Sequence, residues 1–547
     1  MARVAAIGLD SADWALTERL MTDGRMPNLA RLRSRSVEIL THNDIVGKPE
    51  EAWASFLYGD AAYQAGYWSN LAFDPASYRS YRQGIFPGMP FYASDGRRSL
   101  IFDVPKSGIR RDVHGTQVTG WGAHAASFPR ASSPAGVLTE LEESVGTHPG
   151  LNNDYFDGWY QPDYVDELGD ALVAGAALRT RATRHLLERE TGWDLFLTVL
   201  SEPHSGGHHF WHGVDARHVL AGAPTAPQAG RRMIEVYEAV DATLGGIVAA
   251  LPADAVVVVF SVHGMQPNDS DVAAALLLPE LLHRHHGGSP RLKGGDLELW
   301  RRQGYPAVLA DPRRRPLAFA RDTLDASPVA GLRRRAKAGV LLDIERGLRR
   351  ARGRPPAHRP PWKTAADVAP EIDVDTIGPG GVDEPATDYP NLWYRDVWPS
   401  MRAFSLPSFG EGRVRINLRG RERDGIVDAD DYDRTCGEIE QLLADSINPR
   451  TGRSIAAHVE RTHGDDPFDP LAPDGDLLIT WDTAVDAVTH PTLGAVGPFP
   501  MLRMSEHSNA GFALISGEGM EPARARSRPT AELAPLMLAL LEGKAAL

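Results

Sequence analysis

The chain has 547 residues, of which 42% are hydrophobic and 24% charged, values that are ordinary for a soluble globular protein with a sizeable core. Its net charge of −14 argues against nucleic-acid binding, no apolar run is long enough to span a membrane, and a single cysteine, Cys436, excludes an internal disulfide. The first residues lack the charged and apolar regions of a signal peptide, so we expect a cytoplasmic protein.

Four short apolar runs predict buried strands. In chain order they span residues 3–9, 193–200, 255–261 and 511–517, and all are rich in aliphatic or aromatic side chains. Two helical patterns in residues 165–250 surround the second run. Apolar strands that alternate with helices are typical of a sheet buried on both faces, so we predict an α/β fold.

Polar residues stand at one end of each predicted strand. Asp10, His204, His208 and His263 follow three of the strands, and His507 comes just before the fourth. In open α/β sheets, ligands bind beyond the carboxyl ends of the strands. Imidazole and carboxylate groups suit zinc, manganese or iron, so a metal site is one interpretation of this pattern.

Simpler interpretations exist for the same residues. The histidine-rich segment 204–212 is by itself equally compatible with a surface loop, and His209 and His212 can serve in packing. Asp10 precedes an apparent helix over residues 14–20 and could simply cap it. Only the repetition of such residues at several strand ends favours the metal site.

The order of these segments resembles the alkaline phosphatase superfamily, in its type I phosphodiesterase / nucleotide pyrophosphatase branch. The resemblance rests on residues 7–10 with 24–32, on residues 52–59, on the Ser-Val-His-Gly segment 261–264, and on His507. It implies a doubly wound, mostly parallel α/β sheet in one elaborated domain over residues 1–547.

Two segments are expected to elaborate that domain. Residues 60–180 are rich in Gly, Pro, Tyr and Trp, which favours a cap that faces the substrate. Residues 290–395 contain arginine clusters and a proline-rich stretch, which favours an insertion. The basic part could bind an anionic ligand or a partner chain, or could be a solvated helical hairpin.

The resemblance also implies a set of metal ligands. Members of the family hold two metals, usually zinc, beside a Ser or Thr nucleophile that attacks a phosphoryl or sulfuryl centre. The residues that match one metal site are His204, His208 and His507, and those that match the other are Asp10 and His263. His204 stands where the family has Asp, so the first site would present three histidines.

Two further departures affect the expected chemistry. Val262 stands where the family has a second Asp, and valine cannot bind a metal. The nucleophile position matches Pro49, and no Ser or Thr occurs between His42 and Trp53. The covalent phosphoenzyme route of the family is therefore not expected here.

Three interpretations of the function remain open. In the first, hydroxide on the metal attacks a phosphate ester, phosphodiester or related ester directly, with Glu50 or Glu51 as general base and Lys48 stabilising negative charge. A solvated loop is the alternative for these three residues. The second is a non-hydrolytic metalloenzyme of specialised metabolism, and the third a metal-free binding protein. We expect the first, with one or two zinc ions, manganese or iron as alternatives, and a small anionic substrate.

Overall fold

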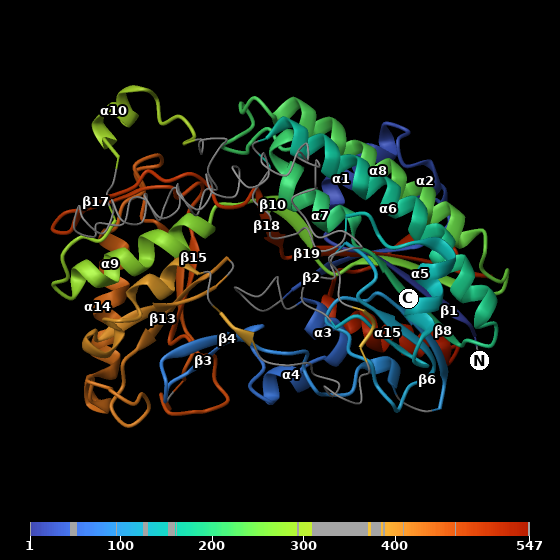
Figure 1. Ribbon diagram of the computed structural model, residues 1–547, viewed down its shortest axis with the longest axis horizontal. Helices are drawn as coiled ribbons and strands as arrows, with labels where there is room; N and C mark the ends of the chain where they lie inside the picture. Colours follow the sequence, from blue (N-terminus) through green and yellow to red (C-terminus); the bar gives the residue numbers. More distant parts are fainter. Residues whose placement is uncertain are drawn as a thin grey trace, which may run out of the picture.

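The computed structural model describes residues 2–43, 52–93, 96–123, 129–150, 159, 161–292, 295–308, 370–372, 384–386, 389–408, 410–464 and 466–544. A large α/β unit and a smaller lobe lie side by side (Figure 1). The α/β unit contains the N-terminal strand and the C-terminal helix, whereas the smaller lobe is built mainly from residues between 270 and 500.

A 10-stranded sheet forms the centre of the larger unit, in the order β20-β2-β19-β9-β1-β8-β5-β6-β7 with β21 beside β2. The bounds are β1 Val4–Leu9, β2 Val37–His42, β5 Arg98–Phe102, β6 His114–Thr119, β7 Ala131–Ser133, β8 Leu195–Leu200, β9 Val256–Ser261, β19 Ala510–Ser516, β20 Ala523–Arg524 and β21 Arg528–Pro529. The central strand β1 pairs in parallel with both β8 and β9. Among the described strands of this sheet, only β19 and β7 run antiparallel to the strands that they join.

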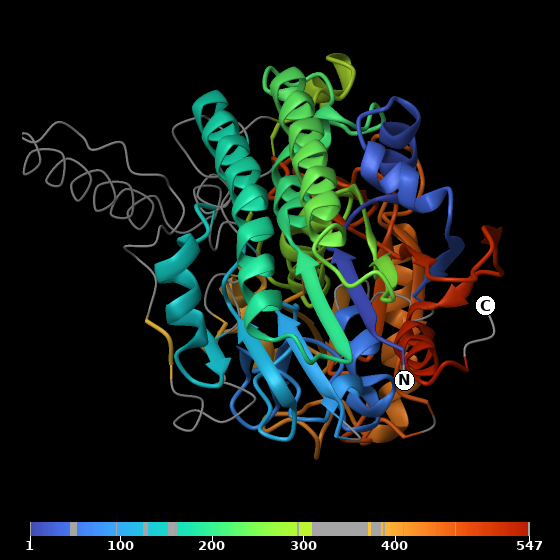
Figure 2. The same cartoon turned by 90° about the vertical axis from the view of Figure 1, so that its right-hand side faces the viewer.

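Helices cover both faces of the sheet, because successive residues of each strand point to opposite sides. Ala5, Ile7 and Leu9 of β1 pack into the core beneath one helical layer, and Val4 and Ala6 pack into the core on the other face. The first layer contains α1 Trp14–Thr22, α2 Pro27–Arg33, α5 Val137–Val145, α6 Pro162–Arg189, α7 Glu202–Phe210 and α8 Ala226–Val248. The second contains α3 Ala52–Tyr58, α4 Ala61–Gln64 and α15 Leu533–Leu541. Figure 2 shows α6 and α8 side by side along the sheet.

The smaller lobe is mainly antiparallel. Its four-stranded sheet has the order β12-β13-β15-β14 and a hydrophobic core of its own. The bounds are β12 Ala403–Leu406, β13 Gly412–Ile416, β14 Ala456–Arg461, β15 Leu477–Trp481, α9 Leu278–His285, α10 Leu297–Arg302 and α14 Tyr432–Asp445. Two small sheets complete it, formed by β3 Leu71–Asp74, β4 Arg79–Arg82 and β11 Glu384–Pro385, and by β16 Val488–His490 and β17 Gly494–Val496.

A short two-stranded sheet joins the segment that follows His263 to the segment that contains His507. The strands β10 Gly264–Pro267 and β18 Ser505–Ser508 pair antiparallel, with Gly264 opposite Ser508 and Met265 opposite His507. Residues more than 200 positions apart therefore meet directly after the end of β9.

The structure confirms the predicted α/β class, with its doubly wound and mostly parallel sheet. The four expected strands correspond to β1, β8, β9 and β19. Residues 60–180 were predicted to be a cap, but the structure places Arg98–Phe102, His114–Thr119 and Ala131–Ser133 of this range in the central sheet. These strands are short and lie in a segment rich in Gly and Tyr, so its composition did not indicate them. Of the expected insertion over residues 290–395, most lies outside the described residues.

Among the described helices, none combines the length and the apolar character that a membrane crossing needs. Cys436 is buried in α14, and burial raises the pKa of its thiol to about 12.

Candidate metal centre

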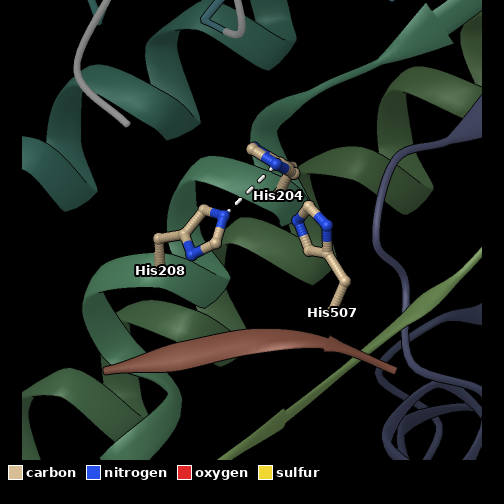
Figure 3. A group of neighbouring side chains, drawn as sticks. All are labelled: His204, His208 and His507. Carbon is tan, nitrogen blue, oxygen red and sulfur yellow. Dashed lines mark hydrogen bonds between the residues drawn. The ribbon is translucent and has the colours of Figure 1, made fainter. Parts of the chain in front are cut away.

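Helix α7 positions the first two histidines at the end of β8. Ser201 precedes the helix and Pro203 lies in its first turn, where the missing backbone N–H costs nothing. His204 and His208 are four residues apart, so both side chains lie on one face of the helix (Figure 3). Both are buried, at 3% and 7% exposure.

The distance between these two rings fits a shared ligand. The Nε2 atom of His208 lies 3.3 Å from the Nε2 atom of His204. Two nitrogens bound to one tetrahedral zinc, each at about 2.0–2.1 Å, lie about 3.3–3.4 Å apart. The helix therefore holds the two rings at a spacing that a zinc ion can bridge.

His507 completes the group from the opposite side. The ribbon of β10 and β18 brings it to ring-centroid distances of 5.0 Å from His204 and 5.2 Å from His208. One ligand atom from each of the three histidines lies within 4.8 Å of the others, in the arrangement drawn in Figure 3. The structure thus brings together the three histidines predicted for the principal metal.

The two ring nitrogens of His507 lie in an unusual environment. Both are buried and neither has a hydrogen-bond partner among the described residues. Burial lowers the pKa of His507 well below its ordinary value, and the charges that His263, His204 and His208 could carry lower it further. A buried neutral imidazole with unpartnered nitrogens is the form that binds a metal, so the donor set fits a zinc-like cation.

Asp10 and His263 lie beside this group, at the ends of β1 and β9. Asp10 is fully buried and its Oδ1 atom accepts a 2.8 Å hydrogen bond from Trp53 Nε1. His263 Nε2 lies 3.7 Å from the same oxygen, and the His263 ring stacks on His507 at 4.1 Å. The predicted second pair is therefore continuous with the three-histidine group.

Two alternatives from the sequence are resolved by local contacts. Asp10 does not cap α1, because Asp13 is the capping residue and accepts from Leu16 N at 2.8 Å. His209 is not part of the group, and its ring packs at 5.4 Å from that of Tyr164.

Val262, at the position of the family's second Asp, is fully buried in the hydrophobic core and cannot be a ligand.

The predicted catalytic residues Lys48, Glu50 and Glu51, and Pro49 with them, lie outside the described residues.

A buried ion network that the sequence did not indicate supports α7. Arg179, from the middle of α6, donates from Nε to Glu202 Oε1 at 3.0 Å and from Nη1 to Asp103 Oδ2 at 3.0 Å. His148 Nε2 lies 3.2 Å from the same Glu202 oxygen. Burial alone would raise the pKa of Glu202, but the charge of Arg179 and the contact with His148 lower it to about 2. Glu202 therefore stays ionised and ties the first turn of α7 to the ends of β5 and β8.

Two serines were also missed. Ser505 Oγ lies 3.3 Å from His208 Nδ1, and Ser11 Oγ lies 3.2 Å from His263 Nδ1. Each hydroxyl contacts the ring nitrogen opposite to the one that faces the site. Such contacts orient metal-binding histidines. Serine is too common for the sequence alone to single out these two.

Glu506 has an unusual ionisation but faces away from the group. Burial raises its pKa to about 7, although hydrogen bonds from Ser270 and Gln266 lower it in part. Adjacent residues of a strand point to opposite faces, so Glu506 lies on the side of β18 away from His507. It is therefore not assigned to the site.

Comparison with known proteins assigns the chain to a family. The family model "Type I phosphodiesterase / nucleotide pyrophosphatase" matches residues 4–338, more than half of the chain, so the chain belongs to this family. No curated protein matches the sequence.

Among solved structures, a phosphonoacetate hydrolase from Sinorhizobium meliloti 1021, in complex with phosphonoformate, is 13% identical, with 100% of this chain and 96% of that chain covered and a TM-score of 0.45. An inactive murine ectonucleotide pyrophosphatase / phosphodiesterase 5 in complex with AMP is 10% identical, with the same coverage of both chains and a TM-score of 0.45.

Proposed function

We propose that the chain is a metal-dependent hydrolase or transferase of a phosphate ester, phosphodiester or related ester, which acts without a covalent phosphoenzyme. The family supports a phosphoester hydrolase. The observation that carries the metal dependence is the group of His204, His208 and His507, in which both ring nitrogens of His507 are buried and have no hydrogen-bond partner among the described residues.

The residues of this chain would divide the work as follows. His204, His208 and His507 would hold the principal metal, and Asp10 with His263 would bind a second metal or orient the reacting water. A zinc ion bound by three imidazoles would act as a Lewis acid and make a bound water more acidic. The Asp10 carboxylate, fixed by Trp53, places one negative charge beside this cationic site. A small anionic ester is the substrate class that we propose.

Two features of the sequence support a mechanism without a covalent intermediate. Pro49 occupies the position of the family's nucleophile, and no Ser or Thr occurs between His42 and Trp53. We keep Lys48, Glu50 and Glu51 as proposed groups for charge stabilisation and proton transfer.

The first experiment measures hydrolysis of bis(p-nitrophenyl) phosphate by the purified chain with zinc, after chelation, and after zinc is restored. We expect activity that chelation abolishes and zinc recovers. His208→Ala should lose bound zinc and activity together. His209→Ala is the matched control, because it removes a buried imidazole from the same helix but not from the metal group. Equal zinc content and activity in both variants would contradict the assignment.

A rapid-quench experiment with phosphorus-labelled substrate tests the mechanism. We expect no labelled protein at any time during turnover. A trapped phosphoserine or phosphothreonine would show that another residue replaces the missing nucleophile.

A second candidate function is favoured by Val262, which stands where the family has an Asp. With Val262 buried in the hydrophobic core, the Asp10 side of the site has one carboxylate fewer than the family pattern. A chain that binds one zinc but hydrolyses no phosphoester would therefore fit a non-hydrolytic metalloenzyme.

A further inference from the structure

Ser11 has a backbone conformation that a serine rarely adopts. It follows Asp10 directly at the end of β1, is fully buried, and has a φ of 55°. This left-handed region suits glycine, whose missing Cβ removes the steric conflict. A non-glycine residue held in such a conformation next to a site is a reason to ask what its side chain does.

The hydroxyl of Ser11 contacts one ring nitrogen of His263. Ser11 Oγ lies 3.2 Å from His263 Nδ1, and the carbonyl oxygen of Gly264 lies 3.3 Å from the same nitrogen. A carbonyl oxygen can only accept a hydrogen bond, so this edge of the ring favours a proton on Nδ1. The Ser11 hydroxyl then accepts from the same N–H.

The opposite edge of the ring faces a competing acceptor. His263 Nε2 lies 3.7 Å from Asp10 Oδ1, and a carboxylate favours a proton on the nitrogen that faces it. A proton on Nε2 would block that nitrogen as a metal ligand. The contacts at Nδ1 therefore decide whether the Nε2 lone pair is available to the metal group.

We propose that Ser11 is a positioning residue that keeps His263 in the Nδ1–H tautomer, with the Nε2 lone pair turned toward Asp10 and the metal centre. Ser11 is not placed as a nucleophile, because its hydroxyl contacts the ring edge opposite to Nε2. The consequence for metal binding rests on the proposed function, whereas the tautomer is a property of the protein itself.

The arrangement matches that of the neighbouring histidine. Ser505 Oγ lies 3.3 Å from His208 Nδ1, while His208 Nε2 faces His204. Two serines from different strands thus contact the Nδ1 atoms of two histidines whose Nε2 atoms point into the site. The backbone of Ser505 is not left-handed, whereas that of Ser11 is. At Ser11, therefore, the contact of the hydroxyl with the histidine ring comes with an unfavourable backbone conformation.

The test separates the hydroxyl from the backbone conformation. Ser11→Gly removes the hydroxyl and relieves the left-handed conformation, and Ser11→Ala removes only the hydroxyl. Ala484→Gly is the matched control, because Ala484 has a φ of 51° and lies in the turn after β15. Nitrogen-15 NMR of histidine-labelled metal-free protein reports the tautomer, with the His263 signals assigned by their loss in His263→Gln.

We expect the Nδ1–H tautomer in the wild-type chain and in Ala484→Gly, and a shift toward Nε2–H in both Ser11 variants. Zinc titration should show at least about tenfold weaker binding in both, as for other residues that orient metal ligands. The melting temperature of metal-free Ser11→Gly should equal or exceed that of the wild type by about 1 °C, as in Ala484→Gly.

Two results would overturn the inference. One is an unchanged His263 tautomer in both Ser11 variants, and the other is a Ser11→Gly protein whose metal-free form melts several degrees lower, which would assign Ser11 a structural role. A wild-type chain that binds no zinc would instead contradict the proposed function, and the tautomer measurement would still decide the role of Ser11.

Discussion

Two buried polar clusters in this chain differ in whether the protein satisfies them. In the smaller lobe, Asp476 accepts from Arg421 Nη1 at 2.7 Å, Arg421 Nη2 at 2.8 Å, Tyr432 Oη at 2.8 Å and Ile416 N at 2.7 Å. In the metal centre, both ring nitrogens of His507 have no partner among the described residues. The first cluster is complete within the protein, and we propose that a metal ion completes the second.

The pKa shifts also differ between the Asp476 cluster and the histidine cluster. Burial would raise the pKa of Asp476, but the hydrogen bonds and charge of Arg421 lower it, so the ion pair persists in the core. Burial lowers the pKa of His507, and its neighbours are mostly other histidines, which lower it further. An ion pair that is complete within the protein stabilises the fold, whereas the buried ring nitrogens of His507, which have no partner among the described residues, cost stability.

The largest expected effect concerns the complete cluster. Arg421→Met leaves Asp476 buried without its ion pair, so the free energy of unfolding should fall by about 3–5 kcal/mol. Urea denaturation should give the same loss with and without zinc. Arg434→Met is the control, since Arg434 is exposed and its pair with Glu438 is worth less than about 1 kcal/mol. A zinc-dependent loss in Arg421→Met would contradict the division into two clusters.

The opposite effect is expected in the incomplete cluster. His507→Phe removes two buried nitrogens that have no partner in the described part of the chain, so the metal-free protein should become more stable by about 1–3 kcal/mol. The same variant should lose the stabilisation of about 2.7 kcal/mol that zinc at 100 times its Kd gives the wild type. Thermal unfolding with zinc and with chelator measures both. A metal-free His507→Phe that is less stable than the wild type would show that the nitrogens have partners.

The pH dependence offers a smaller and independent test beside the site. His212 is buried at 1% exposure, and burial, followed by the charge of His218, lowers its pKa from 6.5 to about 3. The unfolded chain therefore binds a proton that the folded chain excludes, and stability present above pH 6.5 is lost as the pH falls toward 3. The loss is at most about 1.4 kcal/mol per pH unit.

The corresponding variant is His212→Gln. Its stability should fall less steeply between pH 6.5 and 4 than that of the wild type, when both are measured by urea denaturation at each pH. Parallel pH profiles for the variant and the wild type would mean that folding does not exclude the proton from His212.

The smallest effect is expected at the hydroxyl that orients His208. Ser505→Ala removes the contact to Nδ1 but leaves all three imidazoles, so zinc affinity should fall about tenfold and the metal stoichiometry should not change. Zinc titration against a competing chelator measures this change. An unchanged affinity would mean that α7 alone orients His208.

The sequence predicted the strands, and the polar residues grouped at their ends, for a clear physical reason. Parallel strands buried on both faces have continuous apolar runs, and β1, β8 and β9 therefore stand out, together with Asp10, His204 and His263 just beyond them. The supporting contacts are different. Arg179 lies in the middle of a 28-residue helix, and only the packing of α6 against α7 shows that it meets Glu202. The left-handed φ of Ser11 has no signature in the sequence either.

The metal content of the purified chain tests the central claim most directly. Elemental analysis of the wild type and of His208→Ala, prepared in parallel and dialysed against zinc, should give at least one zinc per wild-type chain and a lower count in the variant by one. Two zinc ions in the wild type would place the second at Asp10 and His263. Equal counts in both proteins, or none in either, would contradict the three-histidine metal centre.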